Sequence, residues 1–329
     1  MQRVTVFGGS GFIGRHLVAR LAARGCTVRV AVRDPALANF LRPMGDVGQV
    51  TPVQVNVRDD SAVAAAVADA DAVVNLVGIL FERSQQNFET IHKDAAGRIA
   101  AAAKAAGATR LIQVSALGAS ARGRSRYAWS KAAGEAAVRD AYLGATILRP
   151  SVVFGPEDDF FNRFAALARL LPALPVFGCL MPGFRNGAID LYGDGGTRFQ
   201  PVYVGDVADA IVACLARAQT AGETYELGGP SVYSFKALME LVLRETGRTC
   251  ALLPTPFWYA SLAARFLEFL PKPPLTRDQV TMLRDDNVVS GDAATLAALD
   301  IEPTAAEVIL PTYLDRFRRG GRFHRPQSA

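Results

Sequence analysis

The feature that most limits the possible folds is the stretch VTVFGGSGFIGRHLV, residues 4–18. A β-branched run leads into Gly8, Gly11 and Gly14, spaced G-x-x-G-x-x-G, and an amphipathic run follows. Glycines at this spacing permit a tight turn, a close approach of backbone to a pyrophosphate and close packing of a helix on a sheet. The free amide groups at the start of such a helix attract anions. The stretch therefore predicts a strand–turn–helix unit that binds the phosphates of a nucleotide.

The first 155 residues continue the alternation of short β-branched runs with alanine-rich helical runs. The expected strands are residues 4–7, 27–32, 50–57, 72–77, 111–115 and 146–148, and the expected helices begin near residues 12, 61, 90 and 127. Such alternation is typical of a parallel sheet covered by helices on both faces. The predicted fold class is therefore α/β, a Rossmann-type doubly wound parallel sheet.

The alternation ends after Pro150, where residues 156–197 are rich in Phe, Leu, Pro and Gly. A strand, a helix capped by Asp206 and a second strand in TYELGGP follow, and the chain after Tyr233 is mostly helical. We therefore expect residues 1–155, completed by about 198–230, to form an NAD(P)-binding domain. Residues 156–197 and 231–329 should form a smaller, mostly helical C-terminal lobe.

Composition excludes several classes of protein. A net charge of +5 over 329 residues suits contact with an acidic partner or an anionic surface, but it does not indicate nucleic-acid binding. The 4 cysteines form no C-x-x-C pair and the 3 histidines are far apart, so we expect neither disulfides nor a metal site. The first residues lead directly into a strand, which leaves no room for a signal peptide. The apolar stretches are broken within about 15 residues, too few to span a bilayer.

The end of the second expected strand bears on the choice of cofactor. A protein that binds NAD normally places a carboxylate there for the ribose 2′-hydroxyl, but this strand ends in Val32, Arg33 and Asp34. Arg33 can pair with a 2′-phosphate, assisted by Arg15 at the start of the first helix. The pattern favours NADP(H), while Asp34 leaves NAD(H) open.

The segment YAWSK places Tyr127 and Lys131 four residues apart, on one face of a helix. With NLVG at 75–78 and LRPSVVFGPED at 148–158, it resembles the short-chain dehydrogenase/reductase superfamily in its extended or atypical branch. In that superfamily the tyrosine is a general acid or base, and the lysine lowers its pKa and binds the nicotinamide ribose. A nearby cation does favour a phenolate, which agrees with that role.

The substrate half of such a site is incomplete in this sequence. The superfamily implies a catalytic hydroxyl just after the fifth strand, where this chain has Leu117, and Ser115 is the doubtful alternative at the strand end. Only 12 residues separate Ser115 from Tyr127, about half the spacing in active extended members, and His92 stands where such enzymes often carry asparagine. The sequence leaves open whether the protein is an enzyme.

Several stretches resemble one branch of the superfamily, the nucleotide-binding accessory subunits of respiratory complex I and their bacterial relatives. They are LIQVSALGA, RYAWSKAAGEAAV, ILRPSVVFGPEDDFFNRFA, FQPVYVGDVADAI and PPLTRDQVTMLRDDNVV, together with the opening stretch. The resemblance implies tightly held NADPH, no turnover, complex I subunits at the junction of the peripheral and membrane arms as partners, and contact with the membrane surface. The implied location is cytoplasmic, at the cytoplasmic face of the inner membrane.

The resemblance also implies which residues contact the cofactor. These are Gly8, Ser10, Gly11, Phe12, Ile13, Gly14, Arg15, Arg33, Asn56, Val57, Leu76, Val77, Gly78, Val114, Ser115, Tyr127, Lys131, Pro150, Val152 and Val153. The alternative function is a free NAD(P)-dependent oxidoreductase or epimerase that uses Tyr127 and Lys131.

Two C-terminal segments could serve a partner. Trp258, Leu262, Phe266 and Phe269 form a helical stripe, which most simply packs on its own domain and alternatively docks on a membrane interface or a partner. The arginine-rich tail RFRRGGRFHR suits an anionic headgroup or an acidic face, or a solvated chain end, better than nucleic acid.

Overall fold

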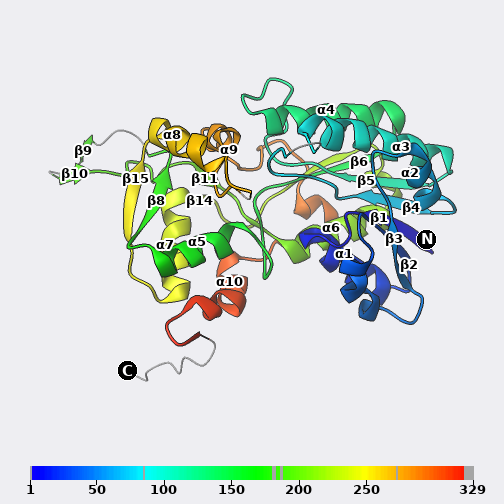
Figure 1. The fold of residues 1–329 in the computed structure, drawn as a ribbon, viewed down its shortest axis with the longest axis horizontal. Helices are drawn as coiled ribbons and strands as arrows, with labels where there is room; N and C mark the ends of the chain where they lie inside the picture. Colours follow the sequence, from blue (N-terminus) through cyan, green and yellow to red (C-terminus); the bar gives the residue numbers. More distant parts are fainter. Residues whose placement is uncertain (1, 84–85, 180–182, 186–187, 272, 322–329) are drawn as a thin grey trace. The chain divides into compact units, whose positions relative to one another are not determined.

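The computed structural model describes residues 2–83, 86–179, 183–185, 188–271 and 273–321, and the chain divides into two compact units (Figure 1). The first unit comprises Met1–Pro150, Val204–Leu227 and Val289–Glu302, and the second comprises Ser151–Tyr203, Gly228–Val288 and Pro303–Ala329. The sequence assigned residues 231–329 to the lobe as one stretch. Residues 289–302 instead pack with the first unit, where the N–H of Glu226 donates to the carbonyl of Ala294 at 2.8 Å.

The core of the first unit is a parallel sheet of seven strands in the order β3-β2-β1-β4-β5-β6-β13. The strands are β1 (Arg3–Phe7), β2 (Thr27–Val32), β3 (Val50–Gln54), β4 (Ala72–Asn75), β5 (Arg110–Val114), β6 (Thr146–Pro150) and β13 (Thr224–Leu227). Val4, Val6, Val28 and Val30 are fully buried, as expected for strands covered on both faces. The predicted Rossmann-type fold is therefore confirmed.

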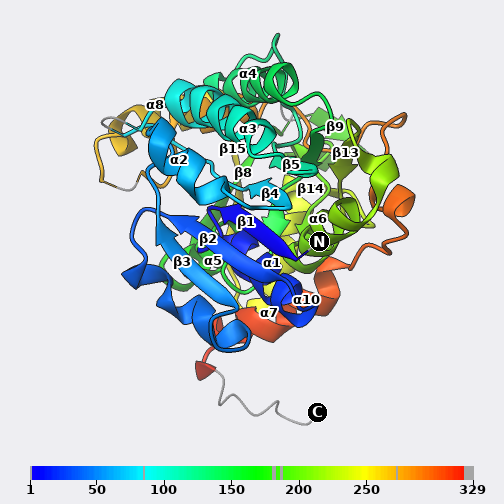
Figure 2. The ribbon, with the colours of Figure 1, turned by 90° about the vertical axis from the view of Figure 1, so that its right-hand side faces the viewer.

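Helices cover both faces of this sheet (Figure 2). One face carries α1 (Phe12–Ala23) and α6 (Val204–Ala216), and the other carries α2 (Asp60–Val67), α3 (Ala95–Ala105) and α4 (Arg126–Ala141). Short 3-10 helices η1 (Ala36–Met44), η3 (Ala218–Thr220) and η4 (Leu296–Leu299) and the π-helix η2 (Glu89–Asp94) complete the unit. The expectation for Asp206 was wrong: α6 begins at Val204, so Asp206 lies inside its first turn rather than at the cap.

The second unit contains five α-helices among its described residues: α5 (Phe160–Leu170), α7 (Phe235–Thr246), α8 (Phe257–Leu267), α9 (Arg277–Met282) and α10 (Ala306–Leu314), with the 3-10 turn η5 (Asp315–Phe317). Short strands pair as β7 (Val153–Phe154) with β12 (Val202–Tyr203), β8 (Ala173–Phe177) with β15 (Ala251–Thr255), β9 (Gly183–Arg185) with β10 (Ala188–Asp190), and β11 (Arg198–Phe199) with β14 (Tyr233–Ser234). Phe235 lies at the centre of its core, with the rings of Phe160, Phe164, Phe177 and Phe199 within 6.1 Å of it.

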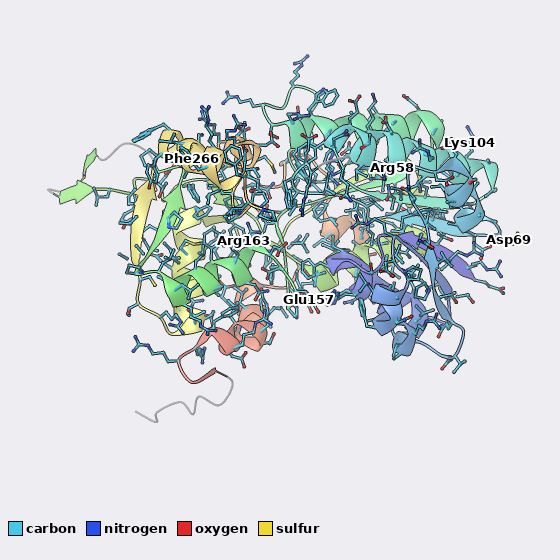
Figure 3. The ribbon with its side chains drawn as sticks, in the orientation of Figure 1. Arg58, Asp69, Lys104, Glu157, Arg163 and Phe266 are labelled. Atoms are coloured by element: carbon cyan, nitrogen blue, oxygen red, sulfur yellow. The ribbon has the colours of Figure 1, made fainter. Side chains whose placement is uncertain are left out.

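The expectation that the stripe on α8 packs on its own domain was wrong. Trp258 and Phe266 on α8 are 69% and 67% exposed, Phe269 just after the helix is 85% exposed, and the helix turns Ala260 and Ala264 toward the core instead. Figure 3 labels Phe266 beside the α8 ribbon. The small alanines let α8 lie close to its own unit, while its largest apolar side chains remain on the surface.

Among the described residues, no helix is both long and apolar enough to cross a membrane. In the C-terminal tail, the Arg316 guanidinium donates to Asn162 Oδ1 at 2.6 Å and the Arg318 guanidinium donates to the carbonyl of Glu245 at 2.7 Å. The part of the expected basic tail from residue 322 onward lies outside the described residues. The described part is tied to the second unit.

Candidate nucleotide-binding site

The glycine turn connects β1 to α1 at the carboxyl edge of the sheet. Gly8 has φ +76°, which favours glycine, and its N–H donates to the carbonyl of Ala31 on β2 at 3.1 Å. A Cβ on Gly14 would lie 2.5 Å from the Cα and the carbonyl oxygen of Gly9, so only glycine lets α1 approach the turn this closely. Gly11 is exposed and is the N-cap of α1.

The first turn of α1 is chemically suited to an anion. No side chain caps it, and it contains no acidic residue. The amide groups of this turn, which includes Phe12 and Ile13 and is preceded by Ser10, therefore present a partial positive charge without a competing carboxylate. These residues fit a pyrophosphate. A nicotinamide dinucleotide bound here would supply hydride chemistry.

Arginines lie at the neighbouring edge of β2. Arg33 is exposed directly after the strand, and the Arg15 guanidinium lies 5.0 Å from the centre of the Phe40 ring on η1. The Asp34 carboxylate accepts a hydrogen bond from the N–H of Ala36 at 2.9 Å, at the start of η1. Asp34 is the carboxylate that the sequence left open as an acceptor for the ribose of NAD(H). One of its oxygens is therefore already engaged by its own loop.

The expected cofactor residues after β3 and β4 lie along the same edge. Asn56 and Val57 follow β3, while Leu76, Val77 and Gly78 follow β4. The N–H of Leu76 donates to the carbonyl of Phe7 at 3.0 Å, and a Cβ on Gly8 would lie 3.2 Å from the carbonyl carbon of Leu76. The segment after β4 therefore borders the glycine turn directly.

Tyr127 and Lys131 occupy the first turns of α4, on one face of the helix. The Lys131 ammonium lies 5.8 Å from the centre of the Tyr127 ring, and Lys131 is only 8% exposed. Burial lowers the pKa of Lys131 to about 8, partly offset by Glu135. The resemblance implied a lowered pKa for Tyr127, but burial of the ring raises its pKa to about 12.

Ser115 and Leu117 lie directly after β5. The Ser115 side chain is 4% exposed, and its hydroxyl has no hydrogen-bond partner among the described residues. Leu117 is also buried, and its N–H donates to the carbonyl of Pro150 at 2.9 Å. Val114 ends β5 opposite Leu148. The structure therefore gives this edge one unpaired buried hydroxyl, and an apolar side chain at the position where the superfamily places the catalytic hydroxyl.

Val152 and Val153 belong to the second unit. Val153 pairs with Val202 between β7 and β12, and the N–H of Val152 donates to Asn287 Oδ1 at 3.2 Å. These contacts are within the second unit, and they leave the proposed part of both residues in cofactor binding as a prediction.

Sequence reasoning did not foresee how His92 and Phe88 surround Tyr127. The His92 ring is stacked on Phe88 at 5.3 Å between centres and meets the edge of Tyr127 at 5.4 Å. Phe88 also contacts the edge of Tyr127, at 5.8 Å. The i,i+4 spacing of Phe88 and His92 was a signal that the two share a helical face, but it could not show which side chain they would meet.

A buried ion network connects α4 to the sheet. Glu135 is almost fully buried, and its carboxylate accepts two hydrogen bonds from the Arg149 guanidinium of β6 at 2.9 and 2.7 Å. Arg149 also lies 3.6 Å from the Glu226 carboxylate of β13, and these partners raise the pKa of its guanidinium. The bidentate pairing ties the helix that carries Tyr127 and Lys131 to β6, and the contact between Arg149 and Glu226 extends the network to β13.

A parallel sheet in this strand order, with a glycine turn at the first strand, defines a dinucleotide-binding protein of the Rossmann class. Residues 4–228 match the model of the NAD dependent epimerase/dehydratase family, and the chain belongs to that family.

Individual relatives extend the comparison to nearly the whole chain. The chain is 38% identical to the mitochondrial NADH dehydrogenase (ubiquinone) 1 alpha subcomplex subunit 9 of Arabidopsis thaliana, over 96% of this chain and 78% of that protein. It is 34% identical to the subunit of the same name from Mus musculus, over 95% and 80% respectively. A solved UDP-glucose 4-epimerase of Thermus thermophilus, in complex with NAD, shares the fold with a TM-score of 0.65 at 22% identity, over 96% of this chain and 99% of that one.

Proposed function

We propose that this chain is a non-catalytic accessory subunit of NADH:quinone oxidoreductase (complex I) that holds NADP(H). The observation that carries the proposal is the contrast within the site. The phosphate-binding turn is built to accept a dinucleotide, whereas the substrate side has the buried Leu117 and a buried Ser115 hydroxyl. The similarity of the chain to complex I subunits supports the assembly part of the proposal.

NADP(H) rather than NAD(H) is the proposed nucleotide. Arg33 and Arg15 provide guanidinium groups for a 2′-phosphate, and Asp34 is engaged with the N–H of Ala36. Guanidinium–phosphate contacts are worth about 1.5–3 kcal/mol each, which corresponds to a change of roughly 10- to 100-fold in affinity.

The nucleotide part is tested by extracting the nucleotide from purified protein and by titration with NADPH and NADH. Arg33→Ala should weaken NADPH binding by roughly 10- to 100-fold and leave NADH binding nearly unchanged. Arg24→Ala, at the opposite end of α1, is the matched control. Gly11→Asp should abolish binding of both nucleotides because a carboxylate would face their phosphates. Tighter binding of NADH than of NADPH by the wild type would overturn the choice of NADP(H).

The assembly part is tested by gentle detergent extraction of native membranes and affinity purification of the tagged chain. Complex I subunits should co-purify in fixed proportion, with the chain at the junction of the peripheral and membrane arms, on the cytoplasmic face of the inner membrane. Recovery of the chain alone under conditions that keep complex I intact would overturn this part.

We further propose that the outer face of α8 is the part that contacts the membrane surface. It combines aromatic and aliphatic side chains with Arg265 on the same exposed surface, as interfacial helices do. The net charge of +5 favours anionic headgroups. In flotation with vesicles that contain phosphatidylglycerol, W258A/F266A should bind several-fold less than the wild type. Val308→Ala, an equally exposed apolar position on α10, is the control; equal binding of the double variant would refute this surface.

A second candidate function is a free NAD(P)-dependent oxidoreductase or epimerase. The shared face of Tyr127 and Lys131 favours it. Its signature is oxidation of bound NADPH that depends on an added carbonyl substrate and is lost in Tyr127→Phe. Such turnover would replace the accessory function as the primary one.

A further inference from the structure

His92 joins two segments that lie far apart in the sequence. Its Nε2 accepts a hydrogen bond from the N–H of Ile79 at 3.0 Å, and its Nδ1 lies 2.8 Å from the hydroxyl oxygen of Ser130. A backbone N–H can only donate, so Nε2 is the unprotonated nitrogen and Nδ1 carries the hydrogen. The Ser130 hydroxyl in turn donates to the carbonyl of Tyr127 at 2.8 Å. Both ring nitrogens are therefore used, one toward the loop after β4 and one toward α4.

The backbone conformation and the packing around His92 hold the residue in place. His92 lies in the π-helix η2, a rare conformation that is frequent at functional sites. A Cβ on Gly134 would lie 2.0 Å from the carbonyl oxygen of His92, so glycine at that position lets η2 lie directly on α4. The stacked Phe88 ring covers the other side of the imidazole. Burial lowers the pKa of His92 to about 3, which keeps the ring neutral at physiological pH.

The loop that His92 holds runs between the two ends of the proposed nucleotide site. At one end, Leu76 borders Gly8 of the phosphate turn. At the other, a Cβ on Gly78 would lie 3.2 Å from the Lys131 ammonium and 3.6 Å from His92 Nε2. Residues 76–79 therefore line the edge of the sheet from the phosphate turn to the lysine. A nucleotide that spans both ends would be bordered by this loop.

We infer that His92 is a positioning residue that, through its hydrogen bond to the N–H of Ile79, fixes the 76–79 loop against Lys131 and slows the release of bound nucleotide. The inference rests on the proposed function, since it concerns how long NADP(H) stays bound. It assigns His92 no contact with substrate or cofactor.

Two amide substitutions separate the two hydrogen bonds. The oxygen of His92→Gln can reach the place of Nε2 and accept from Ile79, whereas the nitrogen of His92→Asn can replace Nδ1 as the donor to Ser130. We expect His92→Asn to speed NADPH dissociation by roughly 5- to 10-fold, the loss of one hydrogen bond, and His92→Gln to stay within about twofold of wild type. Ser130→Ala, which removes the other partner, should also stay near wild type. The readout is stopped-flow displacement of NADPH from the full chain.

A second measurement does not depend on the nucleotide. Amide hydrogen exchange at Ile79 should accelerate in His92→Asn and remain slow in His92→Gln, although each variant loses one hydrogen bond and should lose similar thermal stability. Equal exchange and equal release rates in the two variants would overturn the role of His92. A wild type that protects Ile79 but binds no NADPH would instead overturn the proposed function, so the two failures are distinguishable.

Discussion

At the scale of single residues, the burial of the Lys131 ammonium lowers the stability of the folded chain. This ammonium is buried, and the carboxylate that acts on it electrostatically, Glu135, is already engaged by Arg149. Folding lowers the pKa from 10.5 to about 8, so the unfolded chain holds a proton between these values that the folded chain has released. The free energy of unfolding therefore rises with pH across this window, and the charged lysine costs roughly 3 kcal/mol below it.

We therefore predict that Lys131→Met stabilises the nucleotide-free protein at pH 7 by about 1–3 kcal/mol, because it removes a buried charge and keeps the side-chain volume. The gain should shrink as the pH rises from 8 to 10.5, where the wild-type lysine becomes neutral. Urea unfolding of both proteins at several pH values measures the difference. A methionine variant that is less stable at pH 7 would show that the ammonium has a stabilising partner. The same variant should bind NADPH more weakly, since it cannot donate to ribose hydroxyls.

At the scale of secondary-structure elements, the contact between α1 and the glycine turn is the tightest part of the phosphate site. A methyl group on Gly14 has no room beside the backbone of Gly9. We predict that Gly14→Ala displaces α1, lowers the free energy of unfolding by about 2 kcal/mol or more and weakens NADPH binding. Gly291→Ala is the matched control, because a Cβ there meets nothing within 4 Å. Thermal melting and NADPH titration measure the two effects, and a Gly14 variant as stable as this control would contradict the packing argument.

Some elements could be predicted from the sequence, and the packing of others could not. The strands and α1 were predictable because their signals are local: β-branched runs, a glycine turn and a helical stripe within one short stretch. The α8 stripe was misjudged because periodicity shows that a helix has an apolar face, but not whether another element covers it. On α8 the alanines, including Ala260 and Ala264, face the core. The bond between His92 and Ile79, across 13 residues and a π-helix, depends on tertiary packing that no local pattern encodes.

At the scale of the whole molecule, bound nucleotide should stabilise the two units unequally. A ligand that binds only the folded state adds about 2.7 kcal/mol at 100 times its Kd. The glycine turn, the 76–79 loop and Lys131 all belong to the first unit. We predict that NADPH slows amide exchange mainly in residues 1–150 and 204–227 of the full chain, and that Gly11→Asp removes this protection. Equal protection of both units in hydrogen-exchange mass spectrometry would contradict a site built on the first unit.

The exposed face of α8 also determines how the chain behaves before it has a partner. Large apolar patches are rare on proteins that remain single in solution, and Trp258, Leu262, Phe266 and Phe269 all lie at the surface. We predict that the purified chain self-associates increasingly with concentration and with sulfate, and that W258E/F266E remains monomeric with an unchanged fold. Sedimentation velocity across a concentration series measures this; a monomeric wild type at every concentration would contradict it. In a cell, newly made copies whose α8 face is not covered would expose the same side chains to chaperones and proteases, so a surplus of the protein would be degraded.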